Sequence, residues 1–248
     1  MDEANTGALV TGGSGAIGSA VAAELARAGM DVTVGYRSDT AGANAAAAAV
    51  REHGRDAQIV EADVTDPAAV GRLVERTVEL GPLGVVVNSA GVTEPHAIEE
   101  LSSEAVRRSL AVNAEGAIAV ARAAVPRLRA HGGAIVNVSS VAAEIGTVDV
   151  SYATSKAGVL GATRALAREL GGDGIRVNAV CPGPVDTPMN DAILEHLESR
   201  RFRGHRTVDA LLDRYEAQPE EVATAVRFLA THEFVTGETL RVDGGLSL

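Results

Sequence analysis

Hydrophobic and polar residues alternate along the chain with two different periods, which predict strands and helices in regular succession. Short apolar runs predict strands at residues 8–11, 31–36, 57–61, 83–88, 134–138, 175–180 and 239–242. Apolar residues spaced three and four positions apart predict helices at residues 17–28, 41–53, 67–80, 103–112, 114–130, 152–170 and 220–230. This alternation indicates an α/β fold: a seven-stranded parallel sheet with helices on both faces.

Residues 188–218 depart from this pattern because they are polar, rich in arginine and only weakly periodic. No change in composition marks a second domain, so we predict one domain over residues 1–248 with a helical substrate lid at about 188–218. His205 lies among several arginines of this segment and could contact an anionic substrate. A solvated basic lid is the alternative.

The composition narrows the classes of partner and compartment. The formal net charge is −11, which argues against nucleic acid and anionic membranes as partners. The only cysteine, Cys181, excludes an internal disulfide and suits a reducing compartment. No signal peptide and no apolar run of transmembrane length are visible, so we expect a cytoplasmic protein. The histidines lack metal-ligand spacing, and no metal site is predicted.

Lys156 is the only lysine among 22 basic residues, the others being arginine. Its ammonium is a compact point charge that a planar guanidinium does not reproduce. Tyr152 precedes it by one helical turn, so the two side chains share a helix face. A neighbouring cation favours phenolate over phenol, and we therefore expect the pKa of Tyr152 to be lowered. The pair is a candidate proton donor and acceptor.

A glycine-rich turn at residues 11–18 joins the first predicted strand to the first predicted helix. Glycines allow a tight turn whose backbone N–H groups approach a pyrophosphate at a helix N-terminus. Folds that bind NAD usually place a carboxylate after the second strand for the ribose 2′-hydroxyl. Here Arg37 and Ser38 occupy that region, and the first carboxylate is Asp39. Arg37 and Ser38 could bind a 2′-phosphate, which predicts NADP(H) as the preferred cofactor, with NAD(H) possible.

Further motifs follow in a characteristic order: Asp63-Val64, Asn88-Ser89-Ala90-Gly91, Asn113, Ser139-Ser140, Tyr152-x-x-x-Lys156 and Pro182-Gly183-Pro184-Val185-Asp186-Thr187. Together with the turn, in which Ala16 replaces a glycine, they resemble the short-chain dehydrogenase/reductase family over nearly the whole chain. The resemblance implies a single-domain Rossmann fold. It also implies a catalytic set: Asn113, Ser140, Tyr152 and Lys156.

The resemblance assigns a role to each member of that set. Tyr152 would donate a proton to the substrate oxygen, and Lys156 would lower the tyrosine's pKa and bind the nicotinamide ribose. Ser140 would polarise the carbonyl, and Asn113 would support a water relay. Counting back from Tyr152 with the family's commonest spacing favours Ser139, whereas aligning from the preceding strand favours Ser140 and makes the following loop one residue shorter. We choose Ser140, because loops absorb a deletion more readily than strands do. The implied cofactor-binding residues are Gly12, Ser14, Gly15, Ile17, Gly18, Arg37, Ser38, Asp63, Val64, Asn88, Ala90, Gly91, Tyr152, Lys156, Pro182, Gly183, Val185 and Thr187.

The function expected from this resemblance is NADP(H)-dependent interconversion of a carbonyl and a secondary alcohol. The leading substrate is a 3-oxoacyl thioester of acyl carrier protein or CoA, because the chain resembles the 3-oxoacyl-(acyl-carrier-protein) reductases. Those proteins often place an arginine where this chain has Asp173, although Arg127 and Arg129 could supply positive charge near the site. A sugar, polyol or other alcohol dehydrogenase is the alternative. A non-catalytic NADP(H)-binding regulator would not need Tyr152. Relatives are usually homotetramers, which we also expect here.

Overall fold

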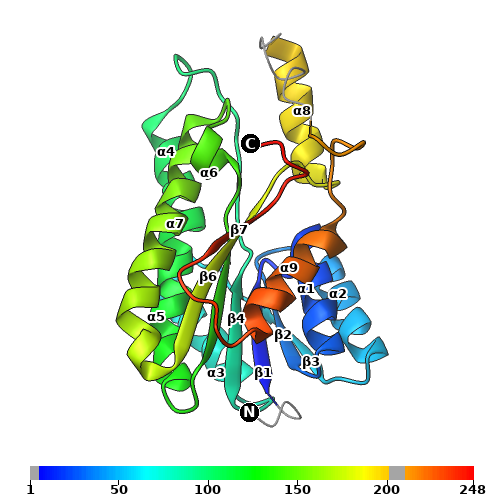
Figure 1. Ribbon diagram of the computed structural model, residues 1–248, viewed down its shortest axis with the longest axis vertical. Helices are drawn as coiled ribbons and strands as arrows, with labels where there is room; N and C mark the ends of the chain where they lie inside the picture. Colours follow the sequence, from blue (N-terminus) through cyan, green and yellow to red (C-terminus); the bar gives the residue numbers. More distant parts are fainter. Residues whose placement is uncertain (1–5, 201–209) are drawn as a thin grey trace.

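The computed structural model describes residues 6–200 and 210–248 and contains one parallel β-sheet (Figure 1). Its strands lie in the order β3-β2-β1-β4-β5-β6-β7. Their bounds are Gly7–Thr11 (β1), Asp31–Tyr36 (β2), Ala57–Glu61 (β3), Leu83–Asn88 (β4), Gly133–Val138 (β5), Ile175–Pro182 (β6) and Thr239–Val242 (β7). The predicted seven-stranded parallel sheet is confirmed.

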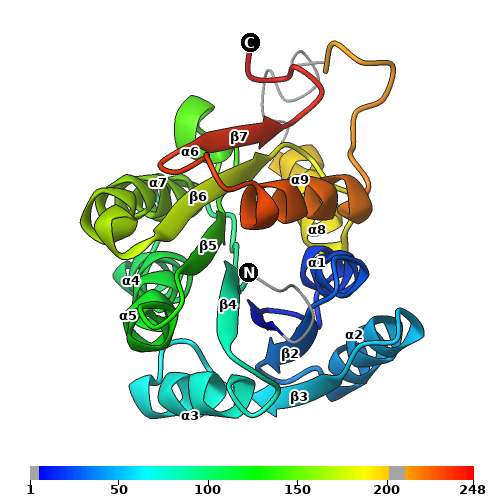
Figure 2. The ribbon, with the colours of Figure 1, turned by 60° about the horizontal axis from the view of Figure 1, so that its bottom comes forward.

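Helices cover both faces of the sheet, as predicted (Figure 2). The helices α1, α2 and α9 pack on one face, and α3, α5 and α7 pack on the other. The helix bounds are Ala16–Arg27 (α1), Thr40–Glu52 (α2), Pro67–Thr77 (α3), Ser103–Leu110 (α4), Gly116–Leu128 (α5), Ala142–Ile145 (α6), Val150–Leu170 (α7), Pro188–Arg200 (α8) and Pro219–Thr231 (α9). A π-helical turn (η1) spans Ala111–Glu115, and a 3₁₀ turn (η2) spans Gly171–Asp173.

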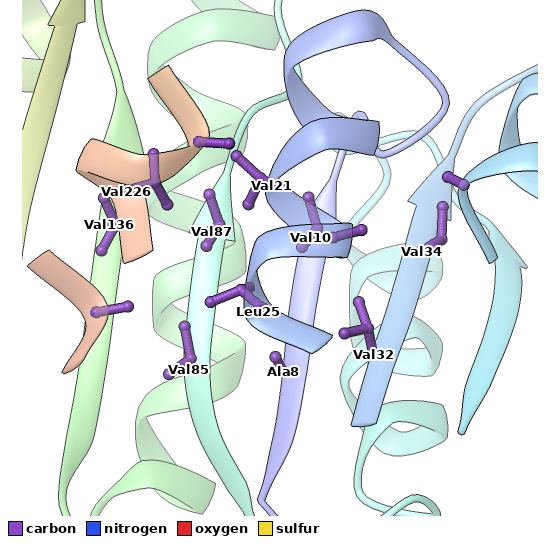
Figure 3. Close-up of a cluster of buried hydrophobic side chains, with 14 of the residues drawn as sticks. Ala8, Val10, Val21, Leu25, Val32, Val34, Val85, Val87, Val136 and Val226 are labelled. Atoms are coloured by element: carbon purple, nitrogen blue, oxygen red, sulfur yellow. The ribbon is translucent and has the colours of Figure 1, made fainter. Parts of the chain in front are cut away.

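Small aliphatic side chains build the core. Val10 and Val87 point from adjacent strands toward Leu25 of α1, and Val226 of α9 packs against the same cluster (Figure 3). Each of these four residues is buried. Strands buried on both faces need continuous apolar runs, which explains why the strand predictions agree with the structure to within a few residues.

The sheet reverses its direction of winding between β1 and β4. The chain first moves outward from β1 through β2 to β3 and then returns to place β4 on the other side of β1. The loops that follow β1 and β4 therefore diverge at the carboxyl ends of the strands. Ligands of open α/β sheets bind in the crevice at such a reversal. The glycine turn follows β1, and Ser89–Gly91 follow β4, so the fold brings both motifs to this crevice.

Of the segment predicted as a lid, residues 188–200 form helix α8. Helix α8 is followed by residues 201–209, which lie outside the described part of the chain, as do His205 and the arginines beside it. Residues 210–218 form no helix and lead into α9. At the base of the segment, Val185 and Ala217 form a parallel bridge, and Asp186 N–H donates to the Ala217 carbonyl at 3.0 Å. None of the described helices is long and apolar enough to cross a membrane.

Candidate active site

A cavity of about 1080 Å³ opens at the carboxyl ends of the strands. Its wall contains every predicted cofactor-binding residue except Asn88, and it contains the predicted catalytic residues Ser140, Tyr152 and Lys156. The glycine turn and Arg37 form one part of this wall, and Tyr152 and Lys156 form another. Beyond Tyr152 the wall is mostly apolar and includes Ile145, Met189, Ile193, Leu197 and Leu246.

The turn after β1 is shaped for close backbone approach. Gly12 has φ +63°, and a Cβ atom there would lie 2.8 Å from the Cα of Ala90. A Cβ atom on Gly18 would lie 2.2 Å from the Gly12 carbonyl oxygen. Gly15 precedes α1 and offers no side chain to cap its first N–H groups. A helix N-terminus of this kind suits an anionic group, so the turn fits the pyrophosphate of a dinucleotide.

The region after β2 places a cation, a hydroxyl and a carboxylate in the cavity wall: Arg37, Ser38 and Asp39. Arg37 and Ser38 line the wall and are exposed. The Asp39 carboxylate is used as the N-cap of α2, where it accepts the Gly42 N–H at 2.9 Å. Asp63 closes this end of the cavity, and its pKa is lowered by hydrogen bonds from Thr65 and, more weakly, by the charge of Arg37.

Tyr152 and Lys156 lie on the first turns of α7 and face each other in the cavity. The Lys156 Nζ is 5.7 Å from the centre of the Tyr152 ring and donates to the Val138 carbonyl at 2.8 Å. Only 5% of Lys156 is exposed. Asp149 is the N-cap of this helix and accepts the Tyr152 N–H at 3.0 Å, which starts the helix beside the catalytic tyrosine candidate.

The expected lowering of the Tyr152 pKa is not found, because burial dominates. Burial raises the pKa of the phenol to about 12, and the Ser140 side chain lowers it only in part. Burial also lowers the pKa of the Lys156 ammonium to about 8. The enclosure that brings the two groups together also removes water from both, and each charged form loses hydration. Sequence spacing indicates the pairing but not this desolvation.

The two candidate serines have different surroundings. The Ser140 side chain lies within hydrogen-bonding reach of the Tyr152 phenol. The Ser139 hydroxyl donates to the Lys156 carbonyl at 2.9 Å, and the residue is 3% exposed. Ser140 thus faces the space beside the phenol, while Ser139 connects the end of β5 to α7.

Asn113 lies behind the cavity wall in the π-helical turn η1. Its side-chain oxygen accepts the Val92 N–H at 2.8 Å, and its amide nitrogen donates to the Val92 carbonyl and to Ser155 Oγ, both at 2.9 Å. A Cβ atom added to Gly91 would be 3.4 Å from both the Asn113 Oδ1 and the Lys156 Nζ, so the two side chains approach the same small space. π-helical turns often occur at functional sites.

Comparison with known proteins shows which family has this fold and these motifs. A family model described as enoyl-(acyl carrier protein) reductase matches residues 12–247. A short-chain dehydrogenase from Mycobacterium paratuberculosis bound to NAD superposes with a TM-score of 0.92 at 28% identity, over 100% of this chain and 99% of the other. The chain belongs to the short-chain dehydrogenase/reductase family.

Other members of the short-chain dehydrogenase/reductase family are similar over the same length. The 3-oxoacyl-[acyl-carrier-protein] reductase FabG of Staphylococcus aureus is 34% identical, over 96% of this chain and 97% of its own. The cis-4-hydroxycyclohexanecarboxylate dehydrogenase of Sinomonas cyclohexanicum is 39% identical, over 96% and 95%. A short-chain dehydrogenase from Burkholderia cenocepacia in complex with NADP has a TM-score of 0.88 at 35% identity and covers all of both chains. Like other family members, this protein is an oxidoreductase acting on CH–OH groups.

Asn88 is the one predicted cofactor-binding residue that does not line the cavity. Its amide donates to Asn137 Oδ1 at 2.9 Å, and Asn137 donates in turn to Thr163 Oγ1 at 2.9 Å. This buried chain of hydrogen bonds links β4, β5 and α7. The first asparagine of this family motif therefore stabilises the framework of the site here and does not form its wall.

The positive charge expected from Arg127 and Arg129 is not near the cavity. Both residues lie where α5 ends, beside the amino-terminal edge of the sheet, whereas the cavity lies at the carboxyl edge. Arg127 donates twice to Glu75 at 2.7 and 2.8 Å, and Arg129 donates to Asp173 at 2.8 Å. Each arginine is thus paired with a carboxylate on the same surface. Among residues 6–200 and 210–248, no cluster of His, Cys, Asp or Glu could hold a metal ion.

Proposed function

We propose that the protein is an NADP(H)-dependent oxidoreductase that interconverts a carbonyl and a secondary alcohol, with Tyr152 as the acid and base. The observation that carries this proposal is the meeting of the Tyr152 phenol, the Ser140 side chain and the Lys156 ammonium in one cavity, into which the glycine turn also opens. Assay of the purified protein with NADPH across a panel of ketones and thioesters tests it. Absence of turnover across the whole panel would favour a nucleotide-binding regulator.

In this proposal, each residue of the site has a separate role in the transfer of a hydride and a proton. A nicotinamide nucleotide, when bound, supplies or accepts the hydride. Tyr152 gives its phenolic proton to the substrate oxygen during reduction, and Ser140 donates a hydrogen bond to that oxygen. The Lys156 ammonium, 5.7 Å from the Tyr152 ring centre, stabilises the phenolate that remains. Asn113 holds the Val92 backbone beside this pair.

The choice of serine has a direct test. Ser140→Ala should lower kcat by roughly a hundredfold, because the variant loses a hydroxyl that lies beside the phenol. Ser139→Ala should change kcat by less than about fivefold, because that hydroxyl is directed to the Lys156 carbonyl. The measurement is steady-state reduction at saturating NADPH for both variants. The reverse ranking would assign the role to Ser139.

The preference for NADP(H) is supported by two neighbouring features of the cavity. Arg37 is the cation that the described wall presents next to Ser38, where a 2′-phosphate can accept charge-assisted hydrogen bonds. Asp39, the first carboxylate after β2, also lines the cavity, but one of its oxygens accepts the Gly42 N–H as the N-cap of α2. Arg37 and Ser38 are therefore the neighbouring side chains that can donate hydrogen bonds to a phosphate. Relatives are found with either nucleotide: the Burkholderia cenocepacia structure is in complex with NADP, and the Mycobacterium paratuberculosis structure is bound to NAD.

Replacement of Arg37 should reverse the preference. Arg37→Asp removes the cation and introduces a carboxylate that can accept the ribose hydroxyl of NAD(H), so the ratio of kcat/KM for NADPH over NADH should fall by at least about a hundredfold. The exposed Arg51→Asp on α2 is the matched control, since Arg51 does not line the cavity. Equal efficiency with both nucleotides in the unmodified protein would refute the preference itself.

For the substrate we propose a 3-oxoacyl thioester, carried by CoA in preference to an acyl carrier protein. The similarity to FabG and the apolar wall beyond Tyr152 support an acyl group. The pairing of Arg127 and Arg129 with carboxylates, together with a net charge of −11, argues against docking of an acidic carrier. Oxidation of NADPH by acetoacetyl-CoA and by the same acyl group on a carrier protein would rank the two.

A second candidate is an alcohol dehydrogenase acting on a small cyclic or polyol substrate. The 39% identity to a cis-4-hydroxycyclohexanecarboxylate dehydrogenase supports it. Turnover of cyclic alcohols with no activity on any thioester would favour this candidate. For either substrate we propose a homotetramer, because Ile118 on α5 and Phe234 in the loop between α9 and β7 are exposed apolar residues that a partner subunit could cover. Light scattering measures the assembly.

A further inference from the structure

Asp149 has a role in the site that the family resemblance does not assign. The residue lines the cavity, yet it is only 3% exposed. Its Oδ1 accepts Ser151 Oγ at 2.7 Å and the Tyr152 N–H at 3.0 Å. Its Oδ2 accepts Thr93 Oγ1 at 2.9 Å and the Glu94 N–H at 3.2 Å. One carboxylate therefore binds the start of α7 with one oxygen and the loop after β4 with the other.

The loop held by Asp149 forms the cavity wall close to Tyr152. Val92, Thr93 and Pro95 line the cavity, and residues 89–97 have neither helical nor strand structure. Such a segment takes its position from the side chains that hold its backbone. Asn113 holds Val92 by two hydrogen bonds, and Asp149 holds the next two residues. Asp149 joins this wall directly to the first turn of the helix carrying Tyr152, and Asn113 adds a second link through Ser155 Oγ of the same helix.

We propose that Asp149 is a positioning and specificity-determining residue: it sets the gap between the Tyr152 phenol and the wall at Val92–Pro95, and so the width of carbonyl substrate that reaches the phenol. This inference rests on the proposed carbonyl chemistry at Tyr152. A carboxylate is required because four donors converge on two oxygens. In Asp149→Asn one side of the amide carries N–H groups, so either the Tyr152 N–H or the Glu94 N–H faces a donor.

Two variants separate this role from general stability. Asp149→Asn disturbs one side of the link, and Thr93→Val removes only the hydroxyl that donates to Oδ2. Asp66→Asn is the matched control, because Asp66 also caps a helix, accepting the Ala68 N–H at 2.9 Å, but is exposed and does not line the cavity. Steady-state kinetics use one slim and one branched ketone with NADPH. Hydrogen exchange of the Glu94 amide reports the link without catalysis.

Asp149→Asn should raise KM for the slim ketone roughly tenfold, while KM for NADPH should stay within about twofold of the native value. The ratio of kcat/KM for the slim ketone over the branched ketone should fall. Thr93→Val should act in the same direction but less strongly. The Glu94 amide should exchange roughly tenfold faster in Asp149→Asn and at the native rate in Asp66→Asn. Unchanged Glu94 exchange, or equal changes in both KM values, would overturn the inference. If the native protein reduced no ketone, the proposed function would fail, and Glu94 exchange alone would decide whether Asp149 positions the loop.

Discussion

Lys156→Arg should lower the rate of carbonyl reduction by about a thousandfold while the chain remains folded. The ammonium occupies a confined space, where it donates to the Val138 carbonyl at 2.8 Å and lies close to the backbone of Gly91. A guanidinium is larger and planar, so it cannot keep this hydrogen bond and its position beside the Tyr152 ring at the same time. The measurement is kcat with saturating NADPH and ketone.

Arg168→Lys on the same helix is the matched control for this exchange of cations. Arg168 is exposed on α7, so its replacement should leave kcat within about twofold of the native value. Thermal unfolding of both variants checks that the chain folds. If Lys156→Arg kept more than about a tenth of the native rate, a compact ammonium would not be needed, and the proposed role of Lys156 would be wrong.

The strands of the sheet could be predicted closely, because a buried strand appears in the sequence as a continuous run of apolar residues. Val85, Val86 and Val87 form an unbroken apolar run, and β4 is buried along its whole length. The π-helical turn around Asn113 could not be predicted. The sequence predicts two helices, at residues 103–112 and 114–130, whereas α4, η1 and α5 form one continuous helical path. Periodicity of apolar residues does not distinguish a π-helical turn from a helix boundary.

Residues of the candidate site could be predicted where a sequence motif places them. The orientation and pKa of a side chain could not, because they depend on neighbours that are distant in the sequence. Tyr152 and Lys156 meet because helical spacing puts them on one face. The choice between Ser139 and Ser140 depends on which hydroxyl turns inward, and the pKa of Tyr152 depends on burial. Asp149 carried one available signal, an aspartate three residues before a helical N–H, which is typical of an N-cap. Its hydrogen bond from Thr93 could not be predicted, because the two residues are far apart in the sequence.

Tyr152→Phe should reduce turnover by about a thousandfold or more in both directions, because the variant keeps the ring but loses the proton that the substrate oxygen takes up. The native protein should show opposite pH behaviour in the two directions. Burial raises the phenol's pKa to about 12, so the group is protonated through the neutral range and ready for reduction. Alcohol oxidation needs the phenolate, whose fraction grows as pH rises toward that pKa. Oxidation should therefore accelerate from about pH 7 to about pH 8, the range in which the Lys156 ammonium, whose pKa burial lowers to about 8, still carries its charge.

Tyr36→Phe provides the control at saturating NADPH, because Tyr36 is a buried tyrosine that lines the same cavity at the end of β2, distant from Lys156 in the sheet order. It should retain kcat within about threefold and keep the rise of oxidation with pH. The Tyr152→Phe protein should lose that rise along with its activity, although it should bind NADPH with an affinity close to native, as fluorescence titration would measure. A Tyr152→Phe variant that retained the pH-dependent oxidation would show that a group other than this phenol moves the proton.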